Sequence, residues 1–183
     1  MGVSHIALAV RDIQATHAFY TEAMGFELVK VEVVPQKGGF ARHAFYSTGS
    51  REDQLIAFWD LANVPGSEDL RTDICRDLGL DPLTNHIAFQ AEDAADLERR
   101  KQRWLDHGCD VLEIDHGWVH SVYTEDPDHI AVEFAVVTRP LTEADAREAL
   151  ELLRAAEPAS SADIPKVTLH KADAAEAKRE GDA

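Results

Sequence analysis

The sequence predicts an α+β protein with two tandem units, each made of a strand, a helix and three further strands. The hexapeptide HIALAV at residues 5–10 recurs as HIAFQA at residues 86–91. Each copy is followed by a helical pattern that ends at a glycine, and then by apolar stretches of strand type. Because the same five elements follow in the same order, the sequence indicates an internal repeat.

The first unit is predicted at residues 1–62. Asp12 is a typical N-cap residue, apolar residues recur at helical spacing from Ile13 to Met24, and Gly25 is placed to end the helix. The apolar stretch FELVKVEVV and the segment HAFYSTGSREDQLIAFWDL, at residues 43–61, then supply three strands.

The second unit is predicted at residues 84–138. Asp93 and Gly108 bound its helix, the stretch CDVLEI follows, and HSVYTEDPDHIAVEFAVV at residues 120–137 reads as a hairpin with a Pro and Asp turn. If the first hairpin is allowed one extra residue, Ala57 of the first unit aligns with Glu133 of the second. In the same alignment Tyr46 takes the place of Tyr123.

The remaining segments read as a linker, a helix and a tail. Residues 63–83 contain Pro-Gly and a short helical pattern between residues 68 and 78, as expected of a linker. Residues 139–157 predict a C-terminal helix, with Thr142 and Asp145 forming a variant capping box. From residue 158 to 183 the chain is small, polar and charged, which predicts a mobile tail.

Composition excludes several classes of function. A formal net charge of −16 disfavours binding to nucleic acid and to anionic membranes. No apolar run approaches the ~20 residues of a membrane span, and the start of the chain lacks the pattern of a signal peptide. Two cysteines are too few for a disulfide framework. We therefore expect a cytoplasmic protein whose partner is a small-molecule substrate.

Three residues form a candidate metal site. His5 and His86 begin the two repeated strands, and small residues two positions later leave room on the same face. Glu133 lies between Val and Phe in the last strand, where a lone carboxylate is costly unless it is paired or metal-bound. Two histidines and one carboxylate match the facial triad of non-haem iron(II) enzymes. The alternative is that the histidines are ordinary strand-end residues and that Glu133 faces water.

The motifs VSHIALAV, AFYTEAMGFELV, NHIAFQAED and YTEDPDHIAVEF resemble the vicinal oxygen chelate superfamily over residues 3–138. This superfamily includes glyoxalase I, extradiol dioxygenases, methylmalonyl-CoA epimerase and bleomycin-resistance proteins. The resemblance implies two βαβββ modules whose curled mixed sheets surround a metal cleft. It also implies that His5, His86 and Glu133 are the metal ligands.

The resemblance to glyoxalase I would require a carboxylate where this chain has Ala57. Three ligands leave positions open for substrate and dioxygen, which favours the extradiol branch: an Fe(II) ring-cleaving dioxygenase acting on a small aromatic diol. Zn, Ni or Mn are alternative metals. The alternative functions are a glyoxalase-like or epimerase-like lyase or isomerase, and a metal-free binding protein of the bleomycin-resistance type.

Three further residues are candidates for catalysis. Tyr123 lies ten residues before Glu133, a spacing at which the resemblance implies a hydrogen bond to a substrate oxygen. Tyr123 is alternatively a core tyrosine, as its alignment with Tyr46 suggests. The acid or base is expected to be His116 or His120, and His116 is preferred because His120 has the opposite strand parity to Tyr123. Apolar walls are expected from Phe45, Phe58, Trp59 and Trp118.

We also expect a homodimer, because open sheets of this kind have exposed edge strands whose unpaired backbone groups a second subunit can cover. The predicted helix at residues 141–156 is the candidate contact.

Overall fold

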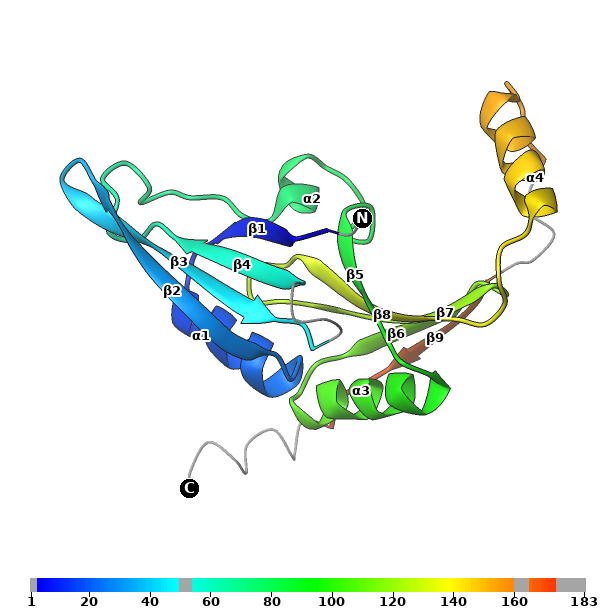
Figure 1. The fold of residues 1–183 in the computed structure, drawn as a ribbon, viewed down its shortest axis with the longest axis horizontal. Helices are drawn as coiled ribbons and strands as arrows, with labels where there is room; N and C mark the ends of the chain where they lie inside the picture. Colours follow the sequence, from blue (N-terminus) through cyan, green and yellow to red (C-terminus); the bar gives the residue numbers. More distant parts are fainter. Residues whose placement is uncertain (1–2, 50–53, 160–164, 174–183) are drawn as a thin grey trace.

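The computed structural model describes residues 3–49, 54–159 and 165–173, which form two mixed β-sheets with their helices (Figure 1). The sheets have four and five strands, and neither is closed into a barrel. The predicted α+β class with two repeated units is therefore confirmed.

The first sheet has the strand order β1-β4-β3-β2, in which β1 is parallel to β4 and the other pairs are antiparallel. The second sheet repeats this arrangement as β5-β8-β7-β6 and adds β9 at its edge. The strands are β1 (His5–Val10), β2 (Glu27–Gln36), β3 (Gly39–Ser47), β4 (Leu55–Asp60), β5 (His86–Gln90), β6 (Val111–Asp115), β7 (Val119–Glu125), β8 (Ala131–Val137) and β9 (Lys166–His170).

Strand β9 lies where the sequence suggested only a tail. Residues 166–170 pair antiparallel with β6, with Leu169 opposite Leu112. Val167 and Leu169 alternate with polar residues, which is the period of a strand, but five residues inside a polar segment give too weak a signal to separate from a tail. The second sheet therefore gains an edge strand that the first sheet lacks.

The helix of each unit begins where an aspartate caps it, as the sequence predicted. Asp12 accepts hydrogen bonds from the backbone amides of the first turn of α1 (Ile13–Ala18), which continues into a π-helical turn, η1 (Phe19–Ala23). The Asp93 side chain accepts a 2.7 Å hydrogen bond from the backbone amide of Asp96 at the start of α3 (Ala94–Asp106). The caps satisfy amide groups that have no partner within the helix.

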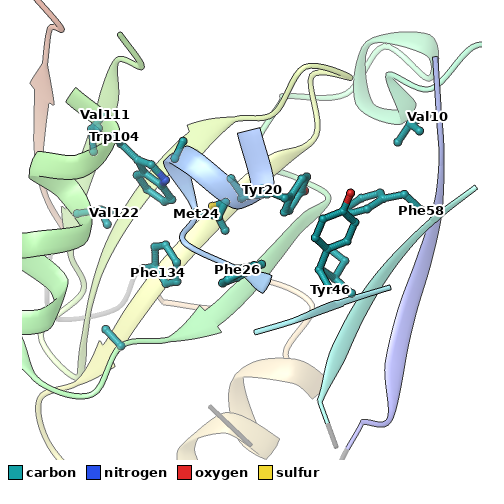
Figure 2. Close-up of a cluster of buried hydrophobic side chains, with 14 of the residues drawn as sticks. Val10, Tyr20, Met24, Phe26, Tyr46, Phe58, Trp104, Val111, Val122 and Phe134 are labelled. Atoms are coloured by element: carbon teal, nitrogen blue, oxygen red, sulfur yellow. The ribbon is translucent and has the colours of Figure 1, made fainter. Parts of the chain in front are cut away.

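The core lies between these helices and one face of each sheet. Figure 2 shows side chains of both units in one cluster, with Tyr20 and Phe58 from the first unit and Trp104 and Phe134 from the second. Phe26 joins the two halves, since its ring centroid lies 6.2 Å from that of Tyr20 and 6.3 Å from that of Phe134. Because successive side chains of a strand point to opposite faces, the face of each sheet away from this core is left for the candidate site.

Two buried aspartates in the turn between β7 and β8 connect the second unit to the rest of the chain. Asp128 accepts hydrogen bonds from the backbone amide of Arg11 at 3.0 Å, from the Arg11 guanidinium at 3.2 Å and from the Thr72 hydroxyl. Asp126 accepts a 3.1 Å hydrogen bond from the Tyr20 hydroxyl. The turn thus binds both the first unit and the linker.

Replacing Asp126 with asparagine is expected to remove a pH-dependent loss of stability. Burial, which outweighs the hydrogen bonds of this carboxyl group, raises its pKa to about 6. The folded protein therefore holds a proton that the unfolded chain releases near pH 4, so the free energy of unfolding falls as pH rises from about 4 to 6. By linkage this fall amounts to about 3 kcal/mol at most.

Urea unfolding of both proteins at pH 5 and pH 7.5 measures this effect. Asp126→Asn should gain stability relative to the parent protein at pH 7.5 and gain less at pH 5. The amide oxygen can still accept the backbone hydrogen bonds that Asp126 accepts from Asp128 and Ile130. An equal difference at the two pH values would contradict the raised pKa of Asp126.

The linker and the C-terminal helix lie outside the two sheets. Within the linker, only the single turn α2 (Ile74–Asp77) is helical, shorter than the predicted pattern. The predicted capping box of Thr142 and Asp145 is confirmed at the start of α4 (Glu143–Arg154). Figure 1 shows α4 standing apart from both sheets, and none of its twelve residues, all of them described, is buried. Among the described residues, no helix is both long and apolar enough to cross a membrane.

Candidate metal centre

His86 and Glu133 meet on neighbouring strands of the second sheet. The parallel pairing of β5 with β8 places Glu133 opposite Ala88, two residues after His86 and on the same face. The small Ala88 side chain leaves this space open. His86 Nε2 lies 3.0 Å from Glu133 Oε2, and the Glu133 side chain is only 7% exposed.

The hydrogen bond on the other side of the His86 ring fixes its orientation. His86 Nδ1 lies 2.8 Å from the Leu83 carbonyl oxygen, which can only accept, so Nδ1 must carry a hydrogen. In the neutral ring, Nε2 is then a bare acceptor facing the Glu133 carboxylate. Two acceptors at this distance are stabilised by a proton or a metal cation between them.

The separation of these two atoms suits a metal centre. Two ligands at right angles with bonds of about 2.1 Å lie about 3.0 Å apart. The buried Glu133 carboxylate and the oriented His86 imidazole therefore fit two adjacent ligand positions of a divalent metal. A backbone carbonyl that orients a metal-binding histidine is the usual supporting arrangement.

Tyr123 and His116 lie beside this pair. Tyr123 is directly opposite Glu133 in the pairing of β7 with β8, and its ring meets the His86 ring edge to face at 5.7 Å between centroids. The Tyr123 hydroxyl is 3.5 Å from His116 Nε2. Burial, followed by the Glu133 carboxylate, raises the pKa of Tyr123, so its hydroxyl stays a neutral donor.

His120 lies on the opposite face of the sheet. Its Nε2 atom is 2.8 Å from Glu113 Oε1, and Glu113 also contacts Lys101 of α3 and His170 of β9. The parity argument that preferred His116 over His120 therefore agrees with the positions of the two side chains. Through its contacts with Lys101 and His170, Glu113 holds α3 and β9 against β6.

His5 begins β1 in the same way that His86 begins β5, but it lies apart from the pair. Its ring meets Phe45 edge to face at 5.9 Å, and its Nδ1 atom is 3.3 Å from the Ser4 hydroxyl. Leu8 of β1 and His86 line one cavity of about 90 Å³, so the two edge strands are neighbours. Among the described residues, no three His, Cys, Asp or Glu side chains are close enough to hold a metal.

The strand registers test the alignment of the two units. Ala57 pairs with Ala7 as Glu133 pairs with Ala88, so Ala57 does occupy the place of Glu133. The residue opposite Ala57 on β3 is Phe45, and it holds the place of Tyr123.

The alignment of Tyr46 with Tyr123 was therefore wrong by one residue. Tyr46 points into the core, where it packs against Phe58. Phe45 and Ala57 are twelve positions apart, whereas Tyr123 and Glu133 are ten apart, so the first hairpin has two extra residues where the alignment allowed one. A shift of one residue in a strand turns every side chain to the other face. Phe58 is also a core residue and not a wall of the site.

An aromatic cluster lines the same face of the first sheet. His43 stacks on Trp59 at 3.8 Å between ring centroids and lies 4.1 Å from Phe45. His43 Nε2 is buried, and no described residue forms a hydrogen bond with it. Burial lowers the pKa of His43, so the ring is neutral. The sequence signal for this residue was its strand parity with Phe45, which the alignment of Tyr46 hid.

The two modules, the histidines that begin equivalent strands and the buried carboxylate together define a protein of the vicinal oxygen chelate class. A family model described as the Glyoxalase/Bleomycin resistance protein/Dioxygenase superfamily matches residues 2–134. The chain belongs to this superfamily.

Solved structures share the fold at low sequence identity. A glyoxylase/bleomycin resistance protein/dioxygenase domain from Frankia sp. EAN1pec is 20% identical with a TM-score of 0.53, over 75% of this chain and 98% of that one. The fosfomycin resistance protein FosX from Listeria monocytogenes is 21% identical with a TM-score of 0.51, over 79% and 98%. A glyoxalase family protein from Enterococcus faecalis is 22% identical with a TM-score of 0.51, over 74% and 97%. No curated protein matches the chain.

Proposed function

We propose that this protein is a metal-dependent enzyme of the extradiol type, which cleaves the ring of a small aromatic diol. His86, Glu133 and His5 would hold Fe(II), with the first two already adjacent. The observation that carries the proposal is the 3.0 Å contact between His86 Nε2 and Glu133 Oε2, beside a neutral Tyr123 and with Ala57 where a fourth ligand would stand. When bound, ferrous iron supplies chelation of the two diol oxygens and activation of dioxygen.

The residues of the chain would bind the diol and move its proton. The Tyr123 hydroxyl, held neutral by its raised pKa and lying beside the His86 ring, would donate a hydrogen bond to a substrate oxygen. His116 lies within 3.5 Å of that hydroxyl and can accept the proton that the diol loses. The aromatic face of Trp59, Phe45 and His43 offers a flat apolar surface for a ring, because planar groups stack on such side chains.

Metal content and oxygen consumption test the proposal. Protein purified without oxygen is expected to retain iron, and catechols supplied with Fe(II) and oxygen should give a yellow semialdehyde product. Zinc or nickel in the purified protein, with isomerisation or cleavage of a 2-oxo or hydroxy-acid substrate, would replace this proposal with a lyase or isomerase. Protein that binds no metal and consumes no oxygen would instead indicate a binding protein.

His116→Ala and His120→Ala are expected to differ sharply in turnover. Loss of a positioned proton acceptor costs about 10²- to 10⁴-fold, so His116→Ala should lower kcat by that factor. His120 contacts Glu113 on the opposite face of the sheet, so His120→Ala should lower kcat by no more than a few fold. Steady-state kinetics with catechol, at equal iron content, make the comparison. Equal losses in the two variants would argue against His116 as the base.

A further inference from the structure

A cavity of about 670 Å³ adjoins the candidate metal centre and is walled on one side by β9. We call it the β9 pocket. Its walls include Leu83 of the linker, Cys109, Leu112 of β6, Tyr123 of β7 and Leu169 of β9. Tyr123 belongs to both the pocket and the centre, and Leu83 supplies the carbonyl oxygen that orients His86. The pocket therefore borders the candidate metal centre at Tyr123.

The strand registers show how the pocket and the centre are connected. Leu169 pairs with Leu112, Leu112 pairs with Tyr123, and Tyr123 pairs with Glu133. These four side chains form one row across the sheet on the face that carries His86. Since neighbouring strands lie about 4.8 Å apart, Leu112 and Leu169 are about 10 and 14 Å from Glu133 along this row. A group that extends from the centre past Tyr123 meets Leu112 first and Leu169 next.

The walls of the pocket favour an uncharged, apolar group. Leu83, Leu112 and Leu169 present aliphatic side chains. Three acidic residues also line the pocket: Asp110 is paired with Lys171 at 2.6 Å, Glu125 with Arg76 at 3.0 Å, and Asp81 accepts a 2.9 Å hydrogen bond from the backbone amide of Leu83. The pocket therefore offers burial of apolar area more than a charge for recognition.

Contacts of the C-terminal segment hold Leu169 in place. His170, the next residue, contacts Glu113 at 2.6 Å, and Lys171 contacts Asp110. Burial would by itself raise the pKa of Glu113, but its hydrogen bonds with Lys101, His170 and His120 lower it, so it stays a carboxylate. The edge strand is thus anchored on one face of the sheet while Leu169 lines the pocket on the other.

We propose that the β9 pocket binds the apolar substituent of an aromatic diol and that Leu169 determines which substituents are accepted. The class of ligand is a catechol that bears an aryl or branched alkyl group, with its diol at the centre and its substituent between Leu112 and Leu169. This proposal rests on the proposed function, because the diol end is placed by the candidate metal centre.

Leu169→Trp, which fills the pocket, is the principal test, and Leu169→Ala removes the wall. The matched control is Val167→Trp, because Val167 is exposed on the same face of β9 but does not line the pocket. Two substrates are compared, catechol and 3-phenylcatechol. Calorimetric titration of the metal-free proteins with 3-phenylcatechol gives a second readout that does not depend on turnover.

Leu169→Trp is expected to raise the ratio of KM for 3-phenylcatechol to KM for catechol by roughly tenfold, the scale on which small changes in apolar pockets discriminate ligands. The calorimetric Kd for 3-phenylcatechol should rise by a similar factor. Leu169→Ala should shift both values in the same direction but by less, and Val167→Trp should shift neither.

The outcomes separate this proposal from the proposed function. Equal KM ratios and equal Kd values in the parent protein and Leu169→Trp would overturn the role of the pocket, even if both turn over catechols. A tenfold change in Kd with no turnover of either substrate would support the pocket and count against ring cleavage. A shift of the same size in Val167→Trp would overturn the assignment, because it would reflect disturbance of β9 as a whole.

Discussion

Glu133→Ala is expected to abolish stoichiometric metal binding and turnover while leaving the fold intact. The carboxylate is the only anionic group among the three proposed ligands His5, His86 and Glu133, and His86 Nε2 lies 3.0 Å from Glu133 Oε2. Without Glu133, the two remaining proposed ligands would be the imidazoles of His5 and His86. These come from different modules and do not form a chelating pair in this structure. Glu133 lies on the face away from the core cluster, so its removal leaves the packing of Phe134 and Trp104 unchanged.

Metal analysis after dialysis, with circular dichroism and thermal unfolding as checks on folding, measures this effect. Glu113→Gln is the matched control, since it removes a carboxylate from the opposite face of the same sheet. It should keep its metal. One equivalent of tightly held metal in folded Glu133→Ala would show that Glu133 is not a ligand.

Asp128→Ala is expected to have the largest effect on stability, lowering the free energy of unfolding by about 2–4 kcal/mol. Breaking a buried ion pair costs about 3–5 kcal/mol, and the value is reduced here because the Arg11 side chain is half exposed. The substitution also leaves the backbone amide of Arg11 and the hydroxyl of Thr72 without their acceptor.

Chemical denaturation at pH 7 measures the loss, and Arg11→Ala is the comparison. That variant leaves the backbone amide and Thr72 still bonded to Asp128, so its loss should be smaller. Because Asp128 joins the second unit to the first and to the linker, a separate early transition of one unit would accompany its loss. A change of less than 1 kcal/mol in Asp128→Ala would show that the turn does not stabilise the assembly of the two units.

The repeated pattern made most of the fold predictable from the sequence. His5 and His86 begin equivalent strands, Asp12 and Asp93 cap equivalent helices, and Ala57 matches Glu133, because apolar periodicity and capping residues are local signals. Tyr46 was misassigned because the first hairpin has two extra residues where the alignment allowed one, and an error of one residue changes the face of a side chain without changing the composition of the strand.

The parts of the site that depend on contacts between distant segments could be predicted less well from the sequence. The approach of His86 to Glu133 follows from the register of two neighbouring strands, which the repeat implied. The separation of His5 from that pair depends on how one sheet packs against the other, and strand periodicity carries no such information. Strand β9 was missed because its exposed side chains resemble those of a polar tail, although Leu169 lines the pocket.

Ala57 also sets the net charge of the candidate centre. A divalent cation held by two neutral imidazoles and one carboxylate keeps a net charge of +1, whereas a second carboxylate at residue 57 would bring it to zero. A positive centre in a partly buried site attracts a singly deprotonated diol more strongly than a neutral centre does. Under the proposed function, alanine rather than a carboxylate at residue 57 would therefore favour an anionic form of the substrate, in addition to leaving a coordination position open.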